Sequence, residues 1–344
     1  MKKNLFNFSV LLIILSFLFS CNSGNINSGE SKYQSVIDSF GKIDKSIANV
    51  SLQINNKPND ADLYFSRGTL FYQMHQLTLA ASDVHKAIEL DSSKTNYYLT
   101  FADINIDARF IKLALQYLQK AKKLDPNNRE LLFKIAKTYL YLKEYDEVVN
   151  TTNEILAVDQ TNSDAFFLQG LVWKEKLDTL KAIALFKISA DNNPDNYNAF
   201  MQLGLLNTFR NKQLAEKYLQ NAIRIDSSKY EGNYALAMLY QVNGDYKKTI
   251  TCYKKMIIKS PQEIQPIYNL GCVYYDMDSL QKAFNSFNLA ITVSSKSADA
   301  FYMRGLCWEK RKNKIQAIKD YETALRLRSD FREALEALSK LKSA

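Results

Sequence analysis

A 34-residue period constrains this chain more than any other feature of its sequence. Small residues recur at Gly68, Ala102, Ala136, Gly170, Gly204, Ala237, Gly271 and Gly305. Successive members lie 34 residues apart, except for 33 between Gly204 and Ala237. In most periods a second small residue follows after about twelve residues, and a third after seven more. A regular period of this length predicts an array of repeats in which each unit buries its apolar face against its neighbours.

Each period predicts two antiparallel helices joined by a short turn. The small residues are expected where the two backbones approach closely, and aromatic residues such as Trp173 and Trp308 fill the space beside them. Pro126 and Pro194, or an Asp-Ser pair in other periods, end the second helix. The whole chain has 10 Gly and 5 Pro, which favours helices over a β-sandwich or barrel. The sequence therefore predicts an all-α fold.

This pattern of length, small and aromatic positions and closing proline resembles the tetratricopeptide repeat. The resemblance implies a right-handed superhelical solenoid of stacked helix-turn-helix hairpins. Eight repeats are predicted over 61–331, with bounds 61–94, 95–128, 129–162, 163–196, 197–229, 230–263, 264–297 and 298–331. Residues 33–60 are predicted as a degenerate leading helix or half-repeat. Residues 332–344 are predicted as a capping helix, with Phe331, Leu335, Leu338 and Leu341 on its apolar face.

The N-terminus predicts export. Two lysines precede an apolar run from Leu5 to Phe19, the pattern of a secretory signal, and the run is shorter than the roughly 20 residues that span a bilayer. Residues 18–21 resemble the lipobox of bacterial lipoproteins. That resemblance implies a signal peptide over 1–20 and acylation of Cys21, palmitate included, which anchors the chain in a membrane. The alternative is a plain signal peptide or uncleaved anchor with an incidental cysteine.

The residues that follow Cys21 predict a tether. Residues 21–32 are rich in Asn, Ser and Gly, which predicts a flexible polar segment. The known sorting rule of such lipoproteins, applied to Asn22, favours the outer membrane of a bacterial cell envelope.

The repeats leave no room for a catalytic domain. His75 and His85 are the only histidines, both in the first repeat, and both are expected at the solvated surface. The sequence has no Gly-rich phosphate loop. Beyond Cys21, three cysteines remain, and they are expected to be packing residues. We therefore expect a protein that is not an enzyme and has no cofactor or metal.

The resemblance places positions 2, 5, 9, 12 and 13 of each repeat on the concave surface. The predicted groove residues are Phe65, Leu99, Phe133, Phe167, Met201, Tyr234, Tyr268 and Tyr302 at position 5, Leu171, Leu205 and Met238 at position 9, and Tyr275 at position 12. Two interpretations stay open for position 5: an exposed stripe that binds a protein or peptide, or packing within the core. Position 2 is never basic, so the net charge of +9 is expected to lie mainly outside the groove.

Three functional hypotheses compete. The favoured one is a membrane-anchored scaffold that holds a protein or peptide partner in its groove during envelope assembly or secretion. The second is a regulatory or adaptor subunit of an envelope enzyme such as a peptidoglycan hydrolase. The third, an RNA-binding helical-repeat protein, is disfavoured by the export signal and by the lack of a basic groove. No nucleic-acid partner is expected.

Overall fold

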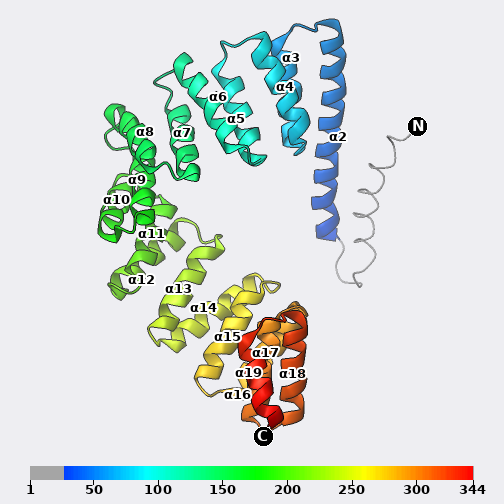
Figure 1. Ribbon diagram of the computed structural model, residues 1–344, viewed down its shortest axis with the longest axis vertical. Helices are drawn as coiled ribbons and strands as arrows, with labels where there is room; N and C mark the ends of the chain where they lie inside the picture. The colour runs from blue at the N-terminus through cyan, green and yellow to red at the C-terminus, as the bar shows by residue number, and fades with distance from the viewer. Residues whose placement is uncertain (1–26, 344) are drawn as a thin grey trace, which may run out of the picture. The chain divides into compact units, whose positions relative to one another are not determined.

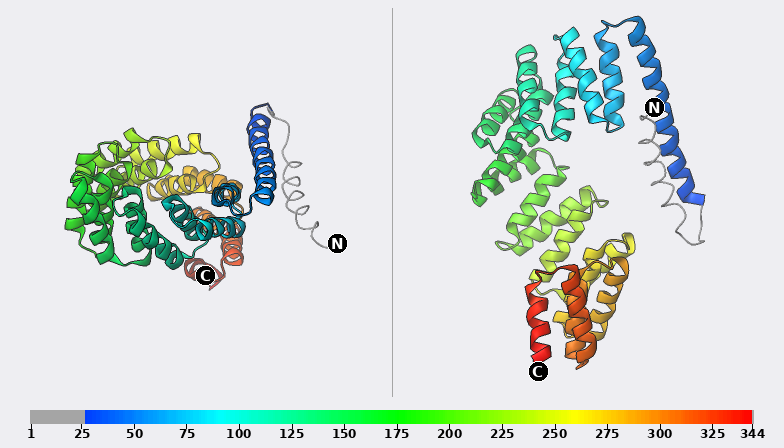
Figure 2. Two further views of the ribbon diagram at one scale, coloured as in Figure 1. Left: turned by 90° about the horizontal axis from the view of Figure 1, so that it is seen from above. Right: turned by 45° about the vertical axis from the view of Figure 1, so that its right-hand side comes forward.

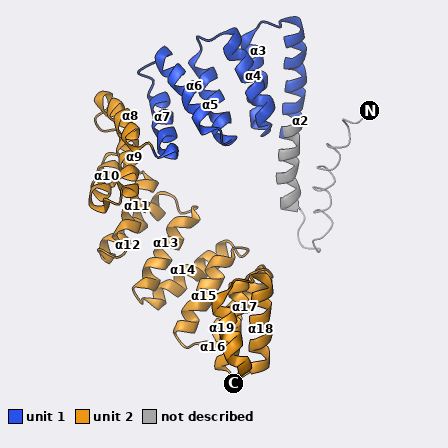
Figure 3. Ribbon diagram, viewed as in Figure 1, with its two compact units in different colours: residues 1–143 blue, residues 144–344 orange. Residues whose placement is uncertain are grey.

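The computed structural model describes residues 27–343, and within that range it contains helices and no strands. The chain divides into two compact units, Met1–Lys143 and Glu144–Ala344 (Figure 3). The first unit contains α2 (Asn27–Asn56), α3 (Ala61–Gln73), α4 (Leu77–Leu90), α5 (Thr95–Asp107), α6 (Ile111–Leu124) and α7 (Arg129–Leu142). The predicted all-α fold is confirmed.

The second unit holds twelve of the described helices (Figures 1 and 2). They are α8 (Tyr145–Val158), α9 (Ser163–Glu175), α10 (Thr179–Asn192), α11 (Tyr197–Asn207), α12 (Lys212–Ile225), α13 (Tyr230–Val242), α14 (Tyr246–Lys259), α15 (Ile264–Asp276), α16 (Leu280–Val293), α17 (Ala298–Lys310), α18 (Lys314–Leu327) and α19 (Arg332–Ser343). The pairs from α9 and α10 to α17 and α18 pack as hairpins, one for each predicted repeat. The unit boundary falls inside the third predicted repeat.

The small residues of the first helix in each hairpin face large side chains of the second helix. A Cβ atom added to Gly305 would lie 2.5 Å from Cε1 of Tyr321, and one on Gly271 would lie 2.6 Å from Cε1 of Phe287. Tyr321 and Phe287 are fully buried. Because protein interiors are close-packed, the absent side chain on the first helix is what admits the ring on the second. The repeated small positions therefore set the spacing between the two helices of a hairpin.

The turn between the two helices of a hairpin uses a left-handed residue at position 15. These residues have φ between 54° and 73° and are His75, Arg109, Lys143, Leu177, Gly244, Asp278 and Lys312. The fifth repeat differs, because Gly204 and Ala215 are one residue closer than the matching small pairs elsewhere. Its first helix, α11, has 11 residues, and its turn at 208–210 contains none of the left-handed residues. The single 33-residue spacing is therefore a shortened turn.

Helix α2 takes the place of a second helix in front of the first repeat. Arg67 Nη1 donates to Ser51 Oγ of α2 at 3.1 Å, just as Arg304 Nη1 donates to Asn288 Oδ1 of the preceding second helix, α16, at 2.6 Å. Both acceptors lie 16 residues before their arginine. The leading helix predicted over 33–60 thus matches the C-terminal part of α2.

The predicted tether is corrected by the start of α2. Residues 27–32 are helical, because α2 begins at Asn27 rather than at residue 33. The segment contains no proline, and helix extension adds one hydrogen bond for each residue that is fixed. The signal peptide, Cys21 and residues 22–26 lie outside the described residues. Between Asn27 and Ser343, no helix is long and apolar enough to cross a membrane.

Helix α19 covers the end of the array with a slightly different face from the predicted one. Phe331, Ala334 and Leu338 are buried against the last repeat, and Leu341 packs beside them. Leu335 is 57% exposed, so its predicted place on the apolar face is wrong. The spacing of 3, 4 and 3 residues places Ala334, and not its neighbour, on the buried stripe.

Candidate partner-binding surface

The position-5 side chains of the second unit pack onto rings of the second helices. The ring centroids of Tyr268 and Phe287 are 5.8 Å apart, and those of Tyr302 and Tyr321 are 5.7 Å apart. Phe167 meets Phe186 in the same way at 5.5 Å. These outer rings are half-buried, and Met201 at the same position is buried. Position 5 therefore contributes to the core and exposes only one edge of each ring.

Tyr234 is fixed further by hydrogen bonds. Asn269 Nδ2 donates to the Tyr234 hydroxyl at 2.9 Å and lies 3.3 Å from the hydroxyl of Tyr253. The Tyr253 hydroxyl donates to Gln241 Oε1 at 3.0 Å. This network joins α13, α14 and α15, so Tyr234 supports the packing of adjacent repeats.

The first unit shows the same half-burial at position 5. Phe65 lies 4.6 Å from Tyr97 between ring centroids, and Leu99 and Phe133 are half-buried. The Nζ of Lys137 lies 4.5 Å from the ring centroid of Phe133. These contacts leave little free apolar surface at position 5 of the first unit.

A more exposed apolar surface lies at positions 9 and 13 of the fifth and sixth repeats. Leu205 is 47% exposed, Phe209 is 86% exposed and Val242 is 51% exposed, while Met238 is half-buried. We call these four residues the apolar patch. Met238 and Val242 are four residues apart on α13, which places them on one face. Leu205 lies on α11, and Phe209 lies in the turn that follows it. The patch offers apolar area that the fold itself does not use.

The shared core of α11 and α13 holds the patch in place. Met201 and Tyr197 of α11 pack in one buried cluster with Leu236 and Leu239 of α13. Phe209 lies in the shortened turn after α11. The turns of the other repeats are one residue longer and contain a left-handed residue at position 15. Tyr141 and Val242, at the same position of repeats with ordinary turns, are also exposed, so exposure is a property of position 13.

The surface around the patch carries few charges. The inward positions 2, 9, 12 and 13 of α11, α13 and α15 and the turn after α11 are occupied by Asn198, Leu205, Thr208, Phe209, Arg210, Glu231, Met238, Gln241, Val242, Gln265, Cys272, Tyr275 and Asp276. The charged members of this set are Arg210, Glu231 and Asp276. Tyr275 is half-buried, with the Nζ of Lys310 4.2 Å from its ring centroid. Leu171 at position 9 of α9 is also half-buried.

The inward positions of the first unit are charged, and their charges are paired. Lys134 Nζ donates to Asp103 at 2.5 and 2.7 Å, and the Tyr72 hydroxyl donates to Asp107 at 2.7 Å. Lys94 Nζ donates to both oxygens of Asp62 at 2.7 Å, and this bond lowers the pKa of Asp62. The inward surface of the first unit thus differs in chemistry from the apolar patch.

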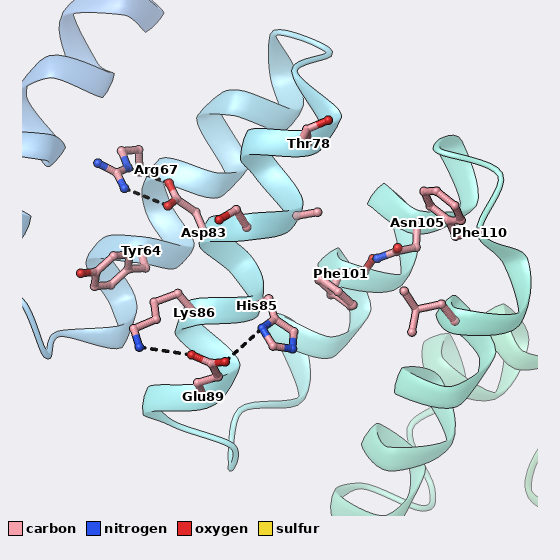
Figure 4. Close-up of a pocket in the computed structure, with 13 residues that line it drawn as sticks. Tyr64, Arg67, Thr78, Asp83, His85, Lys86, Glu89, Phe101, Asn105 and Phe110 are labelled. Atoms are coloured by element: carbon pink, nitrogen blue, oxygen red, sulfur yellow. Dashed lines mark hydrogen bonds and ion pairs between the residues drawn. The ribbon is translucent and has the colours of Figure 1, made fainter.

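A depression of about 810 Å³ lies on the surface of the first unit and is lined by side chains of α3, α4, α5 and α6 (Figure 4). His85 lines it, with Nε2 2.9 Å from the Tyr117 hydroxyl and Nδ1 3.4 Å from Glu89, and its ring lies 5.6 Å from Phe101. His85 packs against these rings on one side, and 43% of its side chain stays exposed. His75 is exposed in the turn after α3.

The cysteines and carboxylates form no metal site within residues 27–343. No group of three or more His, Cys, Asp or Glu side chains there is arranged to hold a metal ion. Cys252, Cys272 and Cys307 are free thiols, the last of them fully buried. Burial raises the pKa of Cys272 and of Cys307 to about 11.

Phe209 and Val242 are absent from the predicted groove residues. Both occupy position 13, which the family resemblance places on the concave surface. The exposed Tyr141 of the first unit occupies the same position of its repeat. The signal was available in the sequence as three apolar residues at a position that is polar or charged in the other five repeats.

Known proteins with similar sequences contain the same kind of repeated helix pair. Residues 264–297 match the family model described as tetratricopeptide repeat. The chain is 23% identical over 251 residues to the BBSome complex member BBS4 of Bos taurus, covering 63% of this chain and 48% of the relative. It is 23% identical over 267 residues to a TPR repeat-containing protein of Methanocaldococcus jannaschii, covering 72% and 47%. The chain thus spans about half the length of these curated relatives.

A solved structure has a similar fold. The C-terminal part of a TPR repeat-containing protein from Cytophaga hutchinsonii superposes with a TM-score of 0.59 at 17% identity. The superposition covers 71% of this chain and 99% of that one.

Proposed function

Because the chain is a tetratricopeptide-repeat protein, we propose that it is a non-catalytic scaffold that binds a protein or peptide partner on the apolar patch. The observation that carries this proposal is the exposure of Leu205, Val242 and Phe209, the first two on helices that a common core holds together and the third in the turn after α11. Full burial of a side chain of this size contributes roughly 1.5–3 kcal/mol. A few such anchors supply most of the affinity in a typical protein interface.

The chemistry of the surface specifies the partner segment. An apolar segment suits the patch, because the inward positions of α11, α13 and α15 are mostly apolar or uncharged. Arg210 and Lys310 are isolated cations at its margin and do not form the basic cluster that a nucleic acid would require. A peptide with two or more large apolar side chains is the ligand that this surface fits.

The second part of the proposal is a lipid anchor at Cys21 in a bacterial cell envelope, with the outer membrane favoured. It is supported by the lysines, apolar run and lipobox-like residues before Cys21. Replacing Cys21 with Ala should release the protein from the membrane fraction or leave the precursor uncleaved. A mutant that is still processed and still membrane-bound would contradict the anchor.

The process served is proposed as envelope assembly or secretion, with regulation of an envelope enzyme as the alternative. Both need only a docking surface, so the identity of the partner separates them. Capture from native membranes with the wild-type protein and with Phe209→Ser/Val242→Ser is the test. A partner that the double variant loses supports the patch as the binding surface, and a partner list that the variant leaves unchanged contradicts it.

A further inference from the structure

The sequence Asp-Ser-Ser-Lys occurs twice, at 91–94 and at 226–229, in the loops before α5 and α13. In both copies the second serine donates through its backbone N and its Oγ to the loop aspartate, at 2.9 and 2.6 Å in the first copy and 2.9 and 2.5 Å in the second. The two loops are therefore built alike, and the first is an internal reference for the second.

The two copies differ in what neutralises the lysine. In the first copy Lys94 bonds both oxygens of Asp62 at 2.7 Å. Asp62 is position 2 of its repeat, and the matching residue of the fifth repeat is Asn198. Lys229 instead lies 3.8 Å from Asp226, whose carboxylate already accepts from Ser228, and 4.2 Å from the ring centroid of Tyr197. The second loop keeps its cation and lacks the position-2 carboxylate.

Two more lysines surround the second loop. Lys229, Lys255 and Lys259 line a cavity of about 120 Å³ between the start of α13 and the end of α14. Lys259 Nζ donates to the carbonyl oxygens of Ser227 and Ser228 at 2.9 and 3.4 Å, which holds it at the rim. The N-terminus of α13 has no side-chain cap, so its first backbone N–H groups add to the positive potential.

Tyr230 also lines the cavity. Its hydroxyl is buried and has no hydrogen-bond partner. Burial, together with Tyr234, Glu263 and Glu231, raises the pKa of Tyr230 to about 12, so the hydroxyl stays protonated at neutral pH. Tyr230 therefore adds an uncharged wall beside the three lysines.

We propose that this cavity binds one phosphate group, held by the ammonium groups of Lys229, Lys255 and Lys259. The volume of about 120 Å³ accommodates a single tetrahedral oxyanion. Charge-assisted hydrogen bonds from several lysines are the usual means of binding such a group. The site is independent of the apolar patch and of the lipid anchor.

Titration with inorganic phosphate, against sodium chloride at equal ionic strength, tests the site by calorimetry or thermal shift. The wild type should show saturable phosphate binding. Lys255→Gln should weaken it by about tenfold or more, the value of one charge-assisted hydrogen bond. Lys254→Gln is the matched control, because Lys254 is an exposed neighbour on α14 that does not line the cavity. It should leave phosphate binding within about twofold, as expected for a charge outside the contact.

Two results would overturn the site: phosphate with no saturable effect beyond that of chloride, or equal weakening by Lys255→Gln and Lys254→Gln. A vesicle arm then identifies the source of the phosphate. If Lys255→Gln also reduces binding to vesicles of phosphatidic acid in phosphatidylcholine, the group is a lipid headgroup. If it leaves vesicle binding unchanged while free phosphate binding falls, the ligand is a soluble phosphate.

Discussion

The guanidinium of Arg304 makes two parallel hydrogen bonds to the carboxylate of Asp320, at 2.8 and 2.7 Å, across the hairpin of α17 and α18. Arg67 and Asp83 make the same pair at 2.6 and 2.8 Å across α3 and α4. Each arginine also donates to the helix in front of its hairpin. These pairs join three helices at the first and the last repeat.

Removing the buried carboxylate of this pair should be strongly destabilising. Asp320→Ala leaves Arg304 partly buried without its partner, and we expect a loss of about 3–5 kcal/mol in the free energy of unfolding. Glu322→Ala, which removes an exposed partner of Lys342, should cost less than about 1 kcal/mol. Chemical denaturation measures both. Equal effects for the two variants would show that the buried geometry adds nothing.

The contact between Gly305 and Tyr321 should behave as a pair. Gly305→Ala places a methyl group against the ring, and we expect a loss of about 1–3 kcal/mol from overpacking. In the second repeat the matching residues are Ala102 and Leu118, both buried. Gly305→Ala combined with Tyr321→Leu should therefore cost less than the sum of the single changes. A double-mutant cycle with no coupling would contradict this close contact.

Replacing the left-handed turn residue Leu177 with glycine should stabilise the fold. Its φ is 62°, and a left-handed conformation costs a non-glycine residue about 1–2 kcal/mol. Glycine avoids this cost but loses more conformational entropy on folding than leucine does. The net effect of Leu177→Gly should be an increase of roughly 0.5–1 kcal/mol in the free energy of unfolding. The reverse change Gly244→Ala, at φ 73°, should lower it by about 1 kcal/mol. Thermal or urea unfolding of both variants measures these two changes in stability. A Leu177→Gly variant that is less stable than the wild type would contradict the prediction.

The buried thiols predict a decline in stability at alkaline pH. Burial raises the pKa of Cys272 and Cys307 to about 11, above the ordinary thiol value of 9.0. Their contribution to stability is fully present below pH 9 and is lost as the pH rises from about 9 to 11, because the unfolded chain ionises first. Cys272→Ala/Cys307→Ala should flatten this decline relative to the wild type. An identical pH dependence of the melting temperature in both proteins would exclude the thiols as its cause.

The hairpins were predictable because their signal is local and repeated. A small residue recurs at the position of Gly305 in every repeat, and the side chain of the second helix that packs against it, Tyr321 in the last repeat, explains why it is small. The exposure of position 5 was not predictable, since Tyr268 can face solvent or a neighbouring ring with the same helical spacing. The packing partner Phe287 decides that question only once the two helices are placed.

The candidate surface needed the structure for a related reason. The period of 33 reveals a shortened turn beside Phe209 in the sequence, but only the structure gives the exposure of this side chain. The prediction that Leu335 is buried was wrong, because neighbouring positions on a helix point in different directions. Ala334 is buried, and the next residue, Leu335, faces solvent. Periodicity thus places helices better than it places single side chains.

The most direct test of the scaffold function is quantitative capture from native membranes with three proteins in parallel. They are the wild type, Phe209→Ser/Val242→Ser, and the control Leu180→Ser/Ile315→Ser, which changes exposed apolar residues of second helices instead. Circular dichroism should show all three folded, because every changed side chain is exposed. The account predicts a partner bound by wild type and control and lost with the patch variant. A partner retained by the patch variant, or lost equally with the control, would contradict it.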